Sequence, residues 1–142
     1  MLRAIIIDDE ESGVETIKIL ASRNQELVKI VASSRKPEQG IDLIEDYKPD
    51  IVFLDISMPN MSGFELLTKL KFRDFKLVFT TAHKEYAIEA IKNHAHDYLL
   101  KPIDTEDFRK CLEEINTIIN PQTSAKKSLA AMIEIQVKDG IV

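Results

Sequence analysis

The sequence predicts an α/β fold in which helices cover both faces of an open, five-stranded parallel sheet. Short runs of β-branched and other apolar residues alternate along the 142-residue chain with segments whose apolar residues recur at helical spacing. The run Ile51–Leu54 is apolar at every position, which is typical of a central strand covered on both faces. With 44% hydrophobic residues, the chain is long enough to bury a core of its own.

Each predicted strand is followed by a predicted helix. The strands are residues 4–7, 27–32, 51–55, 77–79 and 98–100. The helices are indicated by apolar residues at helical spacing over residues 14–21, 37–47, 64–70, 86–91 and 108–119. Pro37 suits the first turn of the second helix, and Asp104 is a candidate N-cap for the last one. Such alternation implies right-handed crossovers, and we expect the flavodoxin-like strand order 2-1-3-4-5.

Polar residues lie at the ends of four predicted strands. They are Asp8 and Asp9 after the first strand, Asp55 after the third, Thr81 after the fourth and Lys101 after the fifth. Because the carboxyl ends of parallel strands meet at one rim of the sheet, we expect these side chains to converge. Clustered carboxylates repel one another unless a cation joins them, and Mg²⁺ prefers carboxylate oxygens, water and phosphate as ligands. A lysine and a hydroxyl opposite would bind an anion, so the set suits phosphoryl transfer onto Asp55.

Simpler explanations account for part of this pattern. Acidic residues 8–11 would be favourable at the N-terminus of the following helix even without a metal. Asp55 by itself is an ordinary residue for a turn. Neither explanation accounts for Lys101 at the same rim.

Composition argues against several classes of function. The net charge of -5 disfavours direct binding of nucleic acid by this domain. No apolar run is long enough to span a membrane, and the N-terminus lacks a signal-peptide pattern, so we expect a cytoplasmic protein. The single cysteine, Cys111, cannot form an internal disulfide and lies among apolar residues, which favours a thiol in the core.

The strand ends carry four short motifs, Ile-Asp-Asp-Glu, Leu-Asp-Ile-Ser-Met-Pro, Thr-Thr-Ala and Leu-Leu-Lys-Pro, in this order. Over about residues 1–120, the chain resembles the response-regulator receiver domains of bacterial two-component signalling. The resemblance implies that Asp55 accepts a phosphoryl group from a sensor histidine kinase in a Mg²⁺-dependent reaction. It also implies that the protein is not an enzyme for outside substrates and catalyses only its own phosphorylation and dephosphorylation.

The resemblance also implies a metal site. Asp9 and Asp55 would bind Mg²⁺ together with the main-chain carbonyl of Ser57. Asp8 would act largely through a water molecule on the metal. These four residues form the expected Mg²⁺ site.

By the same resemblance, Thr81 is the switch hydroxyl, Tyr98 the switch aromatic and Lys101 the lysine that pairs with the phosphate. The peptide between Lys101 and Pro102 is expected to be cis, which is sterically accessible before proline. Phosphorylation would then act on the face formed by the fourth helix, the fifth strand and the fifth helix. A homodimer through this face is one expected consequence.

Two segments resemble a narrower class, the LytTR-type (LytR/AgrA-like) transcriptional regulators. They are His83-Lys84-Glu85-Tyr86-Ala87 and Asp97-Tyr98-Leu99-Leu100-Lys101-Pro102. Members of this class carry a β-rich DNA-binding output domain after the receiver. We therefore expect a receiver over residues 1–120, a linker over 121–131, and the truncated start of the output domain over 132–142. In that last segment, alternating residues 133–138 precede the hairpin signal Asp139-Gly140. DNA would be bound only through the missing domain, to regulate transcription.

Other functions fit parts of the pattern. A receiver that controls a non-DNA output or a partner protein has the same motifs. A phosphatase of the haloacid dehalogenase type also uses a strand-end aspartate, but it needs a second Asp where this chain has Ser57. A flavin mononucleotide site needs a phosphate-binding loop after the first strand, where acidic residues 8–11 would repel the phosphate. An interaction module that is never phosphorylated would have no reason to keep all five site residues together.

Overall fold

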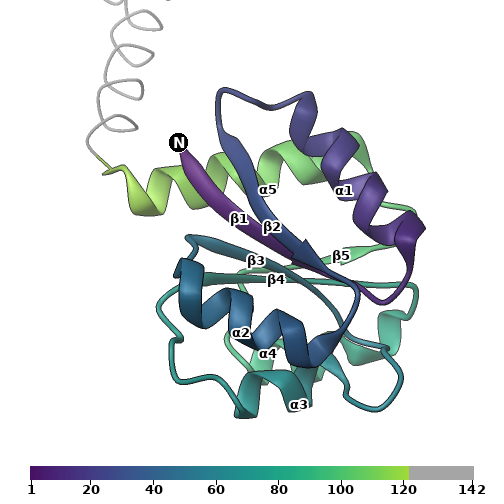
Figure 1. The fold of residues 1–142 in the computed structure, drawn as a ribbon. Coiled ribbons are helices and arrows are strands. Elements are labelled where there is room, and N and C mark those ends of the chain that lie inside the picture. The colour runs from purple at the N-terminus through teal and green to yellow at the C-terminus, as the bar shows by residue number, and fades with distance from the viewer. Residues whose placement is uncertain (122–142) are drawn as a thin grey trace, which may run out of the picture.

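The computed structural model describes residues 1–121 of the 142-residue chain. It contains a parallel sheet with helices on both faces (Figure 1). The strands are β1 (Leu2–Ile7), β2 (Val28–Ser34), β3 (Ile51–Asp55), β4 (Lys76–Thr81) and β5 (Asp97–Leu100). The helices are α1 (Glu11–Ser22), α2 (Pro37–Tyr47), α3 (Gly63–Thr68), α4 (Ala87–Lys92) and α5 (Thr105–Ile119), with a short 3₁₀ helix, η1 (Lys84–Tyr86). The predicted output-domain segment, and the predicted linker from residue 122 on, lie outside the described residues.

The strands lie in the order β2-β1-β3-β4-β5 and are all parallel, which confirms the predicted fold class. Ile7 of β1 pairs with Leu54 of β3, so the residues that follow them, Asp8 and Asp55, are neighbours at the rim. Farther along the sheet, Asp55 pairs with Thr80 of β4. Strand register alone therefore brings the predicted functional residues to one edge of the sheet.

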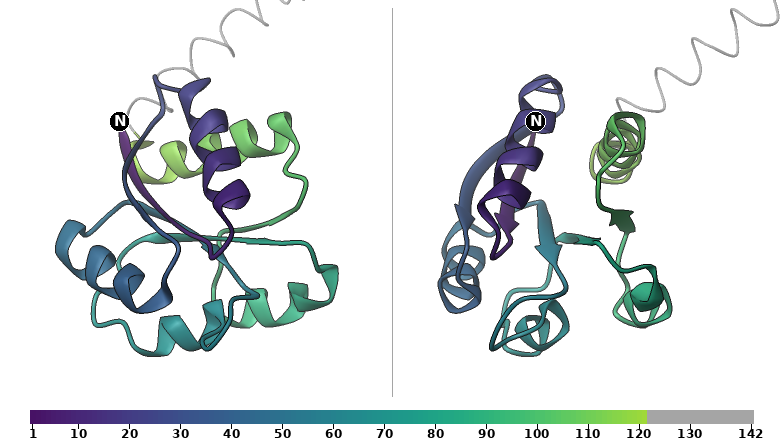
Figure 2. Two further views of the ribbon diagram at one scale, coloured as in Figure 1. Left: turned by 45° about the vertical axis from the view of Figure 1, so that its right-hand side comes forward. Right: turned by 90° about the vertical axis from the view of Figure 1, so that its right-hand side faces the viewer.

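The sheet separates two layers of hydrophobic core. One layer includes α1 and α5 and the other includes α2, α3 and α4, on opposite faces of the sheet (Figures 1 and 2). In the first layer, the rings of Phe53 and Phe108 stack with centroids 5.4 Å apart. Leu54, the neighbour of Phe53, belongs to the second layer. Successive residues of β3 thus serve opposite layers, which explains why this strand is apolar at every position.

The end of α3 differs from the prediction. This helix ends at Thr68, so Leu70 follows it instead of lying within it. The reason lies in α2, where Oε1 of Glu45 accepts hydrogen bonds from the main-chain nitrogens of Lys71 at 2.9 Å and Phe72 at 2.8 Å. These bonds hold the chain after α3 in a non-helical path. The fourth helix also differs, because residues 84–92 are divided between η1 and α4.

Among residues 1–121, we find no helix that is both long and apolar enough to cross a membrane.

Asp104 is the N-cap of α5, as predicted, and its removal should destabilise the domain. Its Oδ1 accepts hydrogen bonds from the main-chain nitrogens of Glu106 at 2.8 Å and Asp107 at 3.0 Å. Asp104→Ala should lower the free energy of unfolding by about 1 kcal/mol. Asp104→Asn keeps an acceptor at the cap and should lower it much less. Urea denaturation measures both changes, and equal losses would contradict a capping role.

Candidate functional site

Three aspartates gather where β1 and β3 end. Asp8, Asp9 and Asp55 each place one carboxylate oxygen so that these atoms lie within 4.8 Å of one another. Asp8 and Asp55 are buried, and Asp9 is half-buried. Oδ1 of Asp9 is buried and has no hydrogen-bond partner within the described part of the chain. Crowded carboxylates, one of them with a buried oxygen that lacks a donor, are a ligand set that fits a hard divalent cation such as Mg²⁺.

Lys101, directly after β5, faces two of these carboxylates. Its Nζ donates a hydrogen bond to Oδ2 of Asp8 at 2.8 Å and lies 3.8 Å from Oδ1 of Asp55. The peptide between Lys101 and Pro102 is cis, as expected. Burial by itself would lower the pKa of Lys101, but the hydrogen bond to Asp8 and the charge of Asp55 raise it overall. Lys101 is therefore a stable cation beside the acidic cluster.

Asp55 is the carboxylate most affected by its surroundings. The pKa of Asp55 is raised to about 8, chiefly by burial and also by the negative charge of Asp8. The charge of Lys101 acts in the opposite direction. A carboxyl group with so high a pKa retains a proton near neutral pH when no metal is bound. A cation that displaces this proton would restore the carboxylate, which is the form that can act as a nucleophile.

Two glycines allow this arrangement, and sequence reasoning missed both. A Cβ on Gly13 of α1 would lie 2.0 Å from Oδ2 of Asp8, so the carboxylate occupies the space of a side chain at this position. A Cβ on Gly63 of α3 would lie 2.6 Å from the main-chain oxygen of Asp55. In the sequence, a glycine within a helical pattern is only an unfavourable helix residue. No local pattern could have indicated these contacts, because they join different elements.

Thr81 and Tyr98 both contact the main chain of His83. The buried Thr81 accepts, through Oγ1, a hydrogen bond from the main-chain nitrogen of His83 at 3.1 Å. The hydroxyl of Tyr98 donates to the main-chain oxygen of the same residue. The ring of Tyr98 is half-buried against the second core layer. The two predicted switch residues are therefore connected through one residue.

Ser57 is not one of the residues that contact one another in the cluster. It is exposed and follows Asp55 by two positions, in the loop before α3. Ser57 and Asp9 line the same cavity, whose walls also include Met58 and Phe64. Ser57 is thus close to the open side of the cluster, whereas Asp8, Asp55 and Lys101 contact one another.

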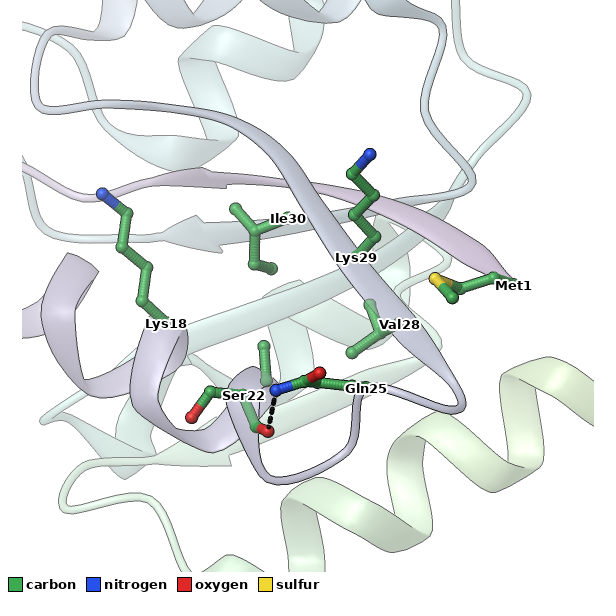
Figure 3. Close-up of a pocket in the computed structure, with 8 residues that line it drawn as sticks. Met1, Lys18, Ser22, Gln25, Val28, Lys29 and Ile30 are labelled. Atoms are coloured by element: carbon green, nitrogen blue, oxygen red, sulfur yellow. Dashed lines mark hydrogen bonds between the residues drawn. The ribbon is translucent and has the colours of Figure 1, made fainter.

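A separate groove lies between α1 and β2 (Figure 3). It is lined by Met1, Lys18, Ala21, Ser22, Gln25, Val28, Lys29 and Ile30. In it, Nε2 of Gln25 donates to the main-chain oxygen of Ser22 at 3.0 Å. These lining residues include no carboxylate, histidine or cysteine, so the groove lacks the side chains that most often bind metal ions in proteins. The carboxylate cluster lies instead at the rim.

Comparisons with known proteins agree with this geometry. The family model of the response regulator receiver domain matches residues 4–113. An uncharacterized response regulatory protein of Vibrio cholerae is 40% identical over 117 residues, which are 81% of this chain and 48% of that protein. The transcriptional regulatory protein BtsR of Escherichia coli (strain K12) is 35% identical over 138 residues, which are 96% of this chain and 55% of that protein. The chain therefore spans about half the length of the curated relatives it matches.

A solved structure supports the same fold. The REC domain of AraT, a response regulator from Geobacillus stearothermophilus, superimposes with a TM-score of 0.76 at 28% sequence identity. The match covers 86% of this chain and 98% of that one.

Asp55→Asn should stabilise the metal-free protein more at high pH than at low pH. Because the pKa of Asp55 is raised from 3.8 to about 8 on folding, the folded protein loses stability as the pH rises between these values. An asparagine does not titrate and lacks this loss. Between about pH 5.5 and pH 8.5, the gain in unfolding free energy should grow by more than about 1 kcal/mol, measured by urea denaturation with EDTA present. A gain that is independent of pH would contradict the raised pKa.

Proposed function

The chain belongs to the response regulator receiver domain family, and we propose that it is a phosphorylation-dependent switch whose Asp55 accepts a phosphoryl group from a sensor histidine kinase. The observation that carries this proposal is the convergence of Asp55 with two further carboxylates and Lys101 at one rim of the sheet. Asp55 would supply a carboxylate oxygen that attacks the phosphorus of a phosphohistidine. The new P–O bond forms as the P–N bond breaks, and the imidazole of the kinase leaves.

The acidic cluster would hold the Mg²⁺ on which this transfer depends. Asp9 and Asp55 are its proposed carboxylate ligands, with the main-chain carbonyl of Ser57, and Asp8 would act through a water molecule. Oδ1 of Asp9, which is buried and has no hydrogen-bond partner in the described residues 1–121, supports this assignment. When bound, the ion would neutralise negative charge on the phosphoryl oxygens.

Lys101 and Thr81 would bind the transferred group. The ammonium of Lys101, 3.8 Å from Asp55, can pair with a phosphoryl oxygen if it gives up part of its contact with Asp8. The Thr81 hydroxyl can donate to another oxygen when it turns away from the main-chain nitrogen of His83. In this proposal, both residues give up a present contact when Asp55 is phosphorylated.

Loss of the contact between Thr81 and His83 would carry the signal outward. The main chain of His83 also accepts the hydrogen bond of Tyr98, so its movement would free this ring to change position. On the same side of the sheet, α4 and β5 expose the apolar side chains of Ile88 and Leu100. We propose that phosphorylation favours a homodimer through the face formed by α4, β5 and α5.

The transcriptional role is a further part of the proposal. The relative BtsR is called a transcriptional regulatory protein, and it is about twice as long as the part matched here. We propose that residues 1–120 form the receiver, 121–131 a linker, and 132–142 the start of a LytTR-type output domain. Because the 142-residue chain has a net charge of -5, we expect it to bind DNA only through that domain.

Asp55→Asn should abolish phosphorylation, because an amide is a poor nucleophile. Intact-mass spectrometry after incubation with acetyl phosphate and Mg²⁺ should show one added phosphoryl group on the wild type and none on the variant. Asp46→Asn, which removes an exposed carboxylate from α2, is the control and should label normally. Wild-type labelling of Asp55→Asn would refute Asp55 as the phosphoacceptor.

In Thr81→Ala, Asp55 should still accept the phosphoryl group. The resulting structural change should be transmitted poorly to the face formed by α4, β5 and α5. Beryllofluoride, a stand-in for the acyl phosphate, should shift the amide NMR signals of this face in the wild type. The shifts should be much smaller in Thr81→Ala, because the variant has no hydroxyl group whose hydrogen bond with His83 could break. Thr68→Ala, on α3, serves as the control. Equal shifts in all three proteins would eliminate Thr81 as the coupling residue.

A further inference from the structure

Arg35 reaches from the turn between β2 and α2 to the acidic loop after β1. Its Nε donates a hydrogen bond to the main-chain oxygen of Asp9 at 3.1 Å, across 26 residues of sequence. We propose that Arg35 is a positioning residue, which holds the main chain of Asp9 so that its carboxylate points into the cation site. This inference rests on the proposed function, since it assumes that Asp9 is a Mg²⁺ ligand.

The turn that carries Arg35 is itself well fixed. The main-chain oxygen of Ser34 accepts a hydrogen bond from the nitrogen of Asp8 at 3.1 Å. The Ser34 hydroxyl accepts from the nitrogen of Lys36 at 3.0 Å and donates to Oε1 of Gln39 at 2.9 Å. Two hydrogen bonds thus join this turn to the acidic loop, one at Asp8 through the main chain and one at Asp9 through Arg35.

Asp9 depends on the hydrogen bond to its main chain more than the other two aspartates depend on theirs, because their carboxylates are held in other ways. The carboxylate of Asp8 is held by Lys101 at 2.8 Å and by the nitrogen of Glu10 at 2.9 Å. Asp55 is the last residue of a strand that is paired on both sides. Oδ1 of Asp9, in contrast, has no partner among residues 1–121. Because no donor holds this oxygen, the position of the main chain, which Arg35 contacts, limits where the carboxylate can point.

Arg35 could affect Mg²⁺ binding either as a nearby positive charge or by positioning Asp9, and experiment can separate these two roles. If Arg35 acted only as a nearby positive charge, it would repel Mg²⁺, and its removal would tighten binding. If it positions Asp9, its removal should weaken binding, because a ligand loses the group that orients it. The two roles thus predict changes of opposite sign in Mg²⁺ affinity.

The experiment is a Mg²⁺ titration followed by amide NMR shifts in the wild type, Arg35→Met and Arg35→Lys. Arg35→Met removes both the charge and the donor, and we expect its affinity to fall about three- to tenfold. Arg35→Lys keeps a charged donor and should bind nearly as the wild type does. Arg23→Met is the matched control, because it removes an exposed arginine just after α1, at the end of the sheet opposite the site. Its affinity should be unchanged.

A measurement on the metal-free protein tests the contact itself. With EDTA present, Arg35→Met should shift the carbonyl ¹³C signal of Asp9, whereas Arg23→Met should leave it in place. Equal or tighter Mg²⁺ binding by Arg35→Met, or an unmoved Asp9 carbonyl signal, would overturn the positioning role. Failure of the wild type to bind Mg²⁺ would instead overturn the proposed metal site.

Discussion

Repulsion among the three aspartates is the constraint on which the rest of the site depends. Their nearest carboxylate oxygens lie within 4.8 Å of one another, and at an effective dielectric constant of about 20 each charged pair costs on the order of 3 kcal/mol. Lys101 compensates Asp8 and Asp55, which it contacts, and a raised pKa relieves Asp55 further. The metal-free site is therefore stabilised by the same cation that would later be needed by a phosphoryl group. If the cluster binds Mg²⁺ as proposed, binding of the ion and release of Lys101 would be linked through this balance of charge.

The sequence was sufficient to predict the fold and to predict that the acidic residues and Lys101 meet at one rim of the sheet. An apolar run such as Ile51–Leu54, bounded by turn residues, is typical of a covered strand, and parallel strands place their carboxyl ends at one rim. Asp8, Asp55 and Lys101 therefore had to be near each other once the strand order was known. The start of α3 was also predictable, because Ser62 and Glu65 have the spacing of a capping box.

Contacts between distant elements were beyond sequence reasoning. The end of α3 depends on Glu45 of α2, and the position of Asp9 depends on Arg35 after β2. The space that Asp8 occupies depends on the absence of a side chain at Gly13. Each of these contacts joins side chains to loops whose paths are determined by packing. The domain division beyond residue 121 and the LytTR-type output remain predictions.

The connection between Thr81 and Tyr98 has a consequence for how this site tolerates mutation. Both hydrogen bonds use the main chain of His83, one its nitrogen and the other its oxygen. The imidazole takes no part in either bond, so many other side chains could replace it without breaking the connection. Proline is the exception, because it has no N–H group. These two bonds therefore place no requirement on the side chain at position 83 beyond the main-chain N–H group.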